Sequence, residues 1–377
     1  MERRTEFDDI RPYYDEEIPA AMRRIAETDM LPLLASYVYP EKSKEEVKEL
    51  LYSFQTIHDF QFEVMKHVNE QVIKRSISKF TNSGLEKLDP QKIYLFISNH
   101  RDIMLDSCLL QYALYLHGFD TTEITFGANL MSSPLIIDIG KANKMFRVER
   151  GGNMKEFYNA LLHLSKYIHY VITEKKQGMW IAQRNGRTKD GNDRTDQAII
   201  NMFCLADPKN KVETLAELHI VPVAISYEWE SCDILKTLEL YESKDKPYVK
   251  KQGEDVNSII TGIMQPKGAV HIEFCDEITR DDLLSFSDLS TKEFLLKVAK
   301  LIDSRILSGY KLCENNYIAL DLLNNNNNYS AHYSEEQKQI FIKHMQKLEQ
   351  HTDKNLNLLK EIFLGIYANP VINKLSL

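Results

Sequence analysis

The chain has 377 residues, of which 43% are hydrophobic and 27% charged, and its net charge is −8. This composition predicts a folded protein with a sizeable core, and the negative charge argues against general nucleic-acid binding. Five scattered cysteines without a C-x-x-C pair predict reduced thiols in a cytoplasmic protein, with no disulfide framework and no zinc site. We also expect no signal peptide and no membrane span, because no stretch approaches about 18 uninterrupted apolar residues.

The first region, residues 1–85, is predicted to be helical. Segments 17–27 ("EIPAAMRRIAE") and 43–80 repeat apolar residues at spacings of three and four with few helix breakers. We expect a helical N-terminal region with a structural role.

The pattern changes in residues 86–285, where short apolar runs alternate with helical stretches such as 153–176. Strands that alternate with helices predict an α/β domain with a largely parallel sheet and flanking helices. The runs are 93–99, 122–128, 144–150, 178–184, 219–229 and 268–278.

The last region, residues 286–377, is predicted to form a helical C-terminal arm. Its helical pattern begins at 290–307 ("STKEFLLKVAKLIDSRIL") and resumes after five consecutive asparagines at 324–328. Such a polar low-complexity stretch is typical of a loop.

Charge is unevenly distributed along the chain. Residues 141–195 carry seven more basic than acidic side chains, although the protein as a whole is acidic. A basic island in an acidic protein indicates an anionic ligand, most simply a phosphate.

Four segments follow one another in the α/β region: "NHRDIMLD" (99–106), "MFRVERGG" (145–152), "WIAQRNGRTKDG" (180–191) and "IVPVAISYEWE" (220–230). Their order resembles the four blocks of the glycerolipid acyltransferases, which include glycerol-3-phosphate and lysophosphatidic acid acyltransferases. Those blocks are N-H-x-x-x-x-D, a strand that ends in Arg, a Glu-Gly-x-Arg-Ser type loop, and an apolar strand with a central proline, matched here by Pro222. The resemblance covers about residues 93 to 228 and implies a glycerol-3-phosphate acyltransferase-like α/β fold.

Two blocks depart from the family pattern. The family aspartate position holds Leu105, and acids stand instead at Asp102 and Asp106. We favour Asp106, because the segment after it, "SCLLQYALYL", resembles the segment after the family aspartate. In the third block Gln183 takes the glutamate position, and Arg187 is displaced by one residue.

The residue types suit acyl transfer to an alcohol. A neutral imidazole, here His100, is a suitable base near pH 7, and a carboxylate from Asp106 or Asp102 would fix its tautomer. Arginine side chains would hold a phosphate by charge-assisted hydrogen bonds, and Gln183 can bond a hydroxyl. The expected phosphate ligands are Arg150 and Arg187, with Arg147, Arg184 and Lys189 as secondary candidates. No metal is expected.

The resemblance implies transfer of a fatty acyl group from acyl carrier protein or coenzyme A to glycerol 3-phosphate or 1-acylglycerol 3-phosphate in phospholipid biosynthesis. The acyl thioester would be a co-substrate, and no other cofactor is expected. The protein would be cytoplasmic and peripheral on the inner face of the membrane. Two alternatives stay open: a catalytically inactive lipid-binding relative, and an O-acyltransferase for an amino-acid lipid.

Overall fold

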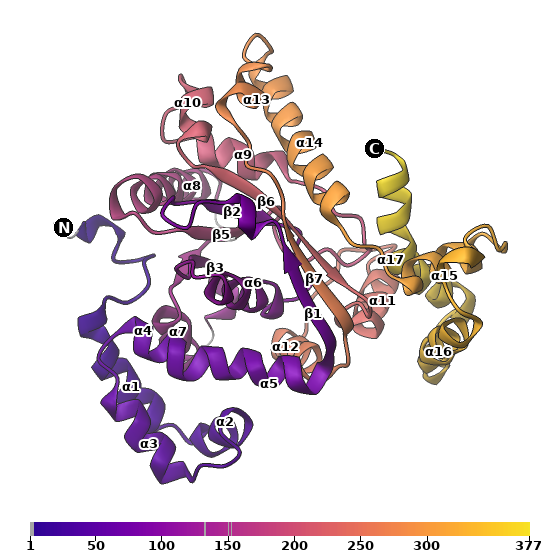
Figure 1. Ribbon diagram of the computed structural model, residues 1–377, viewed down its shortest axis with the longest axis horizontal. Helices are drawn as coiled ribbons and strands as arrows, with labels where there is room; N and C mark the ends of the chain where they lie inside the picture. Colours follow the sequence, from indigo (N-terminus) through magenta and orange to yellow (C-terminus); the bar gives the residue numbers. More distant parts are fainter. Residues whose placement is uncertain (1–3, 132, 150, 152) are drawn as a thin grey trace.

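The computed structural model describes residues 4–131, 133–149, 151 and 153–377. A seven-stranded sheet forms its centre, in the order β1-β7-β6-β2-β5-β3-β4 (Figure 1). All neighbouring strands are parallel except β6 and β7, which are antiparallel. The predicted α/β class with a largely parallel sheet is therefore present. The strands are β1 (Ile77–Ser83), β2 (Leu95–Ser98), β3 (Glu123–Gly127), β4 (Met145–Val148), β5 (Met179–Ala182), β6 (Ile220–Tyr227) and β7 (Gly268–Phe274).

The central strands β2 and β6 are buried along their whole length. Their side chains point alternately to two separate hydrophobic clusters. Leu95 and Ile97 of β2 belong to one cluster, and Phe96 belongs to the other. Burial on both faces explains why these strands read as continuous apolar runs in the sequence.

Helices cover both faces of the sheet (Figure 1). One face packs against α8 (Met154–His169), α9 (Gln197–Cys204) and α14 (Thr291–Gly309). The other face packs against α5 (Lys66–Ser76) and α6 (Leu105–Leu116). In the part of the chain that is described, no helix combines the length and the apolar character needed to cross a membrane.

The N-terminal region is only partly as predicted. Its helices are α1 (Ile18–Ala26), α2 (Leu31–Val38), α3 (Lys44–Ser53), α4 (Ile57–Phe60) and α5, with a π-helical turn before α5. They pack around a hydrophobic cluster of their own, together with α7 (Pro134–Ala142). The helical prediction is wrong at the end of this region, because residues 77–83 form β1, which pairs with β7. Pairing with a strand almost 200 residues away decides this conformation, and local periodicity cannot reveal it.

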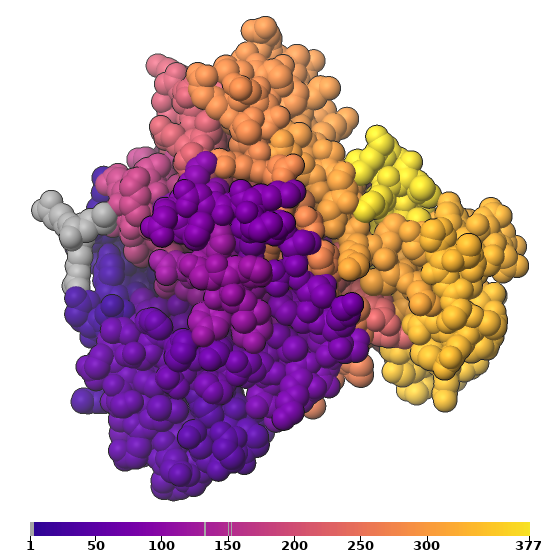
Figure 2. Space-filling model, in the orientation of Figure 1, coloured from indigo at the N-terminus to yellow at the C-terminus, as the bar shows by residue number. Residues whose placement is uncertain are grey.

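Of the predicted C-terminal arm, residues 286–377, helix α14 packs on the sheet instead, and the rest forms a lobe at one side of the molecule (Figure 2). The lobe contains α15 (Glu314–Leu323), α16 (Glu335–Met345) and α17 (Leu356–Leu375), and the asparagines 324–328 form the predicted loop after α15. The arm packs on α11 (Asp233–Glu242). The remaining helices are α10 (Lys211–Ala216), α12 (Glu254–Met264) and α13 (Arg280–Leu284).

Helix α17 supports the loop that follows β5. The side chain of Asn369 donates a hydrogen bond to the carbonyl of Asp190 (2.7 Å), and that of Asn373 donates to Oδ1 of Asn192 (3.0 Å). Between these contacts, Gly191 has a φ of +76°, and a Cβ there would lie 2.1 Å from a backbone oxygen of α17. Only glycine allows this approach.

We expect Gly191→Ala to destabilise the protein more than Gly186→Ala. Gly186 has a similar φ of +74° but open space around its Cβ position, so it isolates the cost of the left-handed backbone, about 1–2 kcal/mol. The clash with α17 should add about 1–3 kcal/mol for Gly191→Ala. Urea unfolding of both variants measures the difference. Equal losses would show that α17 does not press on this loop.

Candidate active site

The candidate site lies where two neighbouring strands end. β2 leads into Asn99 and His100, and β5 leads into segment 183–196. The Asn99 side chain donates to the carbonyl of Ile225 (2.9 Å) and accepts from its N–H (2.8 Å), which extends the bonding of β2 with β6. The N–H of Thr188 donates to the carbonyl of His100 (2.7 Å). Because the carboxyl ends of parallel strands meet at one edge of a sheet, the two loops lie side by side.

His100 and Asp106 form a hydrogen-bonded pair. Nδ1 of His100 lies 2.8 Å from Oδ2 of Asp106. An ionised carboxylate only accepts hydrogen bonds, so Nδ1 carries a proton, and in a neutral imidazole Nε2 then keeps its lone pair. No described residue bonds to Nε2, and His100 lines a cavity. The structure thus places Asp106 beside the imidazole, with Nε2 available to a ligand.

Four donors surround the Asp106 carboxylate. Besides His100, these are the N–H groups of Arg101 (2.6 Å) and Asp102 (2.9 Å) and the hydroxyl of Tyr227 (2.8 Å). Burial raises the pKa of Asp106, but the hydrogen bonds from His100 and the other donors outweigh burial and lower it. Since the pKa is lower in the folded state, the ionised carboxylate stabilises the fold near neutral pH. That stabilisation is lost as the pH falls through the folded pKa.

Asp102 has a different task. Its Oδ1 accepts hydrogen bonds from the N–H groups of Met104 and Leu105, both 2.9 Å, and its Oδ2 accepts one from the Ser231 hydroxyl. Asp102 therefore caps the first turn of α6. Among the described residues, no hydrogen bond joins Asp102 to the imidazole. Leu105, in the family aspartate position, is fully buried in the core.

A buried ionic cluster supports the turn that carries His100. Arg101 is 1% exposed, and its guanidinium contacts Asp193 (2.6 Å) and Glu230 (3.0 Å). Lys236 pairs with Glu230 and donates to the carbonyl of Arg101 (2.7 Å). Burial lowers the pKa of Arg101, but the charges of Asp193 and Glu230 hold it well above its usual value. The cluster therefore brings two basic side chains, Arg101 and Lys236, against two acidic ones.

The cavity beside His100 has a volume of about 630 Å³. Its lining is amphipathic, which suits a ligand with an apolar chain and a charged group. Its large apolar side chains include Ile124, Phe126, Ile136, Ile139, Met145 and Trp180. Its charged side chains are Arg184, Arg187, Lys189, Lys250, Asp190, Glu239 and Asp255.

Three of the predicted phosphate ligands line this cavity. Nη1 of Arg187 is buried and has no hydrogen-bond partner among the described residues. Arg184 forms no ion pair within the same residues, whereas Lys189 is paired with Glu239. Arg184 and Arg187 therefore remain available to an anion.

Two of the predicted residues do not line the cavity, contrary to our expectation. Ala182 lines it, and because side chains alternate along an extended chain, Gln183 points to the opposite face, where it is fully buried. Arg147 is exposed on β4 and pairs with Glu149 (2.7 Å). Arg150 lies outside the described residues.

Comparisons with known proteins give a distant structural likeness. No protein-family model and no curated protein matches the sequence. Among solved structures, the chain is similar to the 1-acyl-sn-glycerophosphate (LPA) acyltransferase PlsC from Thermotoga maritima. The match has 11% identity and a TM-score of 0.36, and covers 76% of this chain and 93% of that chain. At this TM-score the likeness assigns no function, so the functional interpretation rests on the geometry of the site.

Several residues that position the pair did not stand out in the sequence. The Trp180 ring meets the His100 ring edge to face at 5.8 Å, and its indole N–H donates to the Ser98 hydroxyl (3.0 Å). Tyr227 binds Asp106 from β6. The only sequence signal for Trp180 and Tyr227 was that each is an aromatic residue with a hydrogen-bonding group inside an apolar run. Within the described residues, no group of three or more His, Cys, Asp or Glu side chains is arranged to hold a metal ion.

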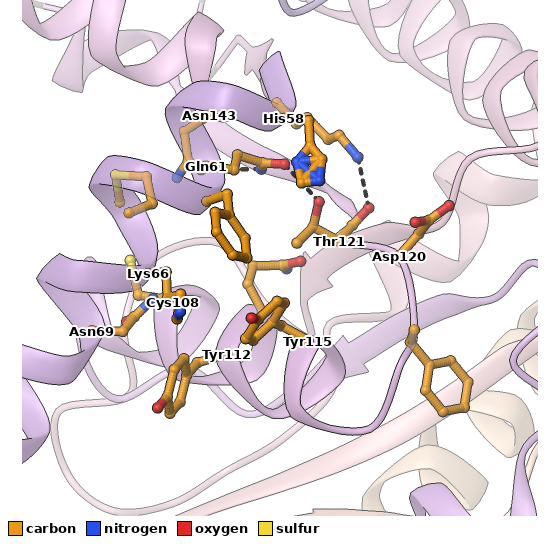
Figure 3. Close-up of a pocket in the computed structure, with 15 residues that line it drawn as sticks. His58, Gln61, Lys66, Asn69, Cys108, Tyr112, Tyr115, Asp120, Thr121 and Asn143 are labelled. Atoms are coloured by element: carbon orange, nitrogen blue, oxygen red, sulfur yellow. Dashed lines mark hydrogen bonds between the residues drawn. The ribbon is translucent and has the colours of Figure 1, made fainter. Parts of the chain in front are cut away.

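A second cavity, of about 260 Å³, is separate from this site (Figure 3). It lies among the π-helical turn, α5, α6 and the turns before β3 and β4, and His100 does not line it. Gln61 crosses it, donating to Asn143 (3.2 Å) and accepting from Thr121 (2.7 Å). Burial lowers the pKa of Lys144 there to about 8. These contacts join the N-terminal helices to the sheet.

We expect Arg101→Met to lower the free energy of unfolding by about 3–5 kcal/mol, because it leaves Asp193 and Glu230 buried with one cation instead of two. Urea unfolding measures the loss. The matched control is Arg280→Met, which removes an exposed pair with Glu213 and should have no measurable effect. A small loss for Arg101→Met would mean that water or Lys236 compensates the anions.

Proposed function

We propose that the protein is an acyltransferase that moves a fatty acyl group from a thioester to a hydroxyl of a phosphorylated glycerol. The observation that carries the proposal is the His100–Asp106 pair, which leaves Nε2 of the imidazole open to an amphipathic cavity. A base of this kind needs no nucleophile on the protein, because the acceptor hydroxyl itself attacks the thioester.

The proposed reaction follows from the tautomer of His100. Nε2 takes the proton of the acceptor hydroxyl while the hydroxyl oxygen attacks the thioester carbonyl. Asp106 stabilises the imidazolium that forms. The tetrahedral intermediate then collapses, the carbon–sulfur bond breaks, and the thiolate takes the proton back from the imidazolium. The products are an ester and a free thiol, and the enzyme returns to its initial state.

The cavity lining supports the choice of substrates. The apolar wall formed by β3, β4 and α7 suits a fatty acyl chain. Arg184 and Arg187 lack protein partners among the described residues, and the planar guanidinium matches phosphate oxygens. We infer glycerol 3-phosphate or 1-acylglycerol 3-phosphate as the acceptor class, and acyl-CoA or acyl carrier protein as the donor. We place the reaction in phospholipid biosynthesis, at the cytoplasmic face of a membrane.

His100→Ala should reduce kcat by at least about 100-fold, because a general base contributes about that much or more. Asp106→Asn should also reduce kcat, since the amide can no longer hold the imidazolium. Initial rates with a radiolabelled acyl thioester and glycerol 3-phosphate or 1-acylglycerol 3-phosphate measure both.

Asp102→Asn is the control for this comparison. It keeps the acceptor oxygen that caps α6 and does not touch the imidazole, so its kcat should stay closer to the wild-type value than that of Asp106→Asn. Near-normal turnover by a folded His100→Ala protein would refute the mechanism. A wild-type protein that binds lipid without turnover would identify it instead as an inactive relative.

Arg187→Ala should raise the KM for the phosphorylated acceptor. Loss of one charged hydrogen-bond partner costs about 1.5–3 kcal/mol, which corresponds to roughly 10- to 100-fold. The KM for the acyl thioester should change much less. Arg147→Ala is the matched control, because Arg147 lies outside the cavity and is already paired. Equal effects of the two substitutions, or equal use of an unphosphorylated acceptor, would contradict the phosphate assignment.

A further inference from the structure

Helix α12 exposes a stripe of apolar side chains on its outer face. Val256, Ile260 and Met264 follow one another at intervals of four residues and are 47%, 56% and 62% exposed. The inner side of the same helix carries the buried Ser258 and Gly262, and Ile263 there packs against the core. The helix is therefore apolar on both sides, whereas a surface helix ordinarily has a polar outer face. The exposed stripe therefore indicates a partner that covers it.

The inner face of α12 belongs to the wall of the candidate site. A Cβ at Gly262 would lie 2.2 Å from Oδ2 of Asp102, so the helix rests directly on the turn that carries His100. Asp255 and Ile259 line the cavity beside His100. In the fold, α12 lies beside α5 (Figure 1). One helix thus separates the cavity from the outer surface.

The segment that leads into α12 is basic. Residues 244–251 contain four exposed lysines and a single aspartate. The acidic residues at the start of α12 are engaged within the protein. Asp255 pairs with Lys250, and Glu254 accepts a hydrogen bond from the hydroxyl of Tyr248 (2.8 Å). Lys244, Lys246 and Lys251 form no ion pair with a described residue, and their positive charge is complementary to an anionic surface. Val249, in the same segment, is 81% exposed.

We propose that the outer face of α12 and segment 244–251 dock onto an anionic lipid bilayer, beside the opening of the cavity. The proposal deepens the proposed function, since a lipid substrate would then pass from the bilayer into the site along one helix. An apolar stripe flanked by lysines is the pattern of a helix that lies in the interface of an anionic membrane. A stable protein partner fits less well, because it needs about 20–30 residues on each side.

Sedimentation of the full-length protein with phosphatidylcholine vesicles that contain phosphatidylglycerol tests this docking without any substrate. Ile260→Glu combined with Met264→Glu should weaken binding at least about tenfold, because it places charge in the apolar interface. Changing Lys244, Lys246 and Lys251 to Gln should weaken it by on the order of 100-fold, since each lysine contributes about 1 kcal/mol, or about fivefold. Wild-type binding should fall sharply with pure phosphatidylcholine vesicles.

The control pair is Met30→Glu with Leu33→Glu, which changes two side chains of similar exposure in the N-terminal region. Its vesicle binding should equal that of the wild type. Loss of binding in this pair and not in the α12 pair would overturn the proposal. Failure of the wild-type protein to bind anionic vesicles would also overturn it. A dimer in solution that Ile260→Glu dissociates would assign the face to a second copy of the chain. The lysine variant leaves the apolar stripe intact. Its vesicle binding therefore tests the proposal even if the glutamate pair fails to fold.

Activity toward glycerol 3-phosphate, a soluble acceptor, separates docking from chemistry. The α12 variants should keep this activity, because their changed side chains do not line the cavity. Vesicle binding without acyl transfer would support the docking surface and refute the proposed reaction. Acyl transfer to the soluble acceptor without vesicle binding would support the proposed reaction and overturn the docking surface.

Discussion

The buried charge of Arg101 is the constraint on which the site depends. A guanidinium that is 1% exposed is stable only if anions and carbonyl groups surround it. The chain supplies Asp193 from the loop after β5 and Glu230 from the end of β6. Arg101 thereby joins the ends of three strands. His100 precedes it directly, so the position of the imidazole follows from this cluster.

The Asp106 carboxylate adds the second constraint. It holds the imidazole in one orientation, and it also accepts hydrogen bonds from the turn before α6 and from Tyr227 on β6. A group that is fully buried and ionised requires this many donors. These hydrogen bonds offset the cost of burying the carboxylate. The one from Nδ1 of His100 also fixes the orientation that leaves Nε2 open to the cavity.

The peripheral helices reach the site through backbone approaches that only glycine permits. α17 presses on Gly191, next to the loop that holds Asp193, and α12 rests on Asp102 through Gly262. The C-terminal arm and α12 are therefore part of the support of the site. A lipid surface that binds the outer face of α12 would act on a helix already in contact with the turn that carries His100.

The sequence by itself determined the elements whose signals are local. Six apolar runs became β2 to β7, because strands buried on both faces must be apolar throughout. His100 and two nearby acids were visible as residue types that suit proton transfer. Tertiary structure alone decided that 77–83 is a strand, since its partner lies in β7. It placed Asp106, which the sequence already favoured over Asp102, beside the imidazole, and it turned Gln183 away from the cavity. These outcomes depend on where the chain folds back on itself. Sequence spacing records which groups are present, and packing decides which of them meet.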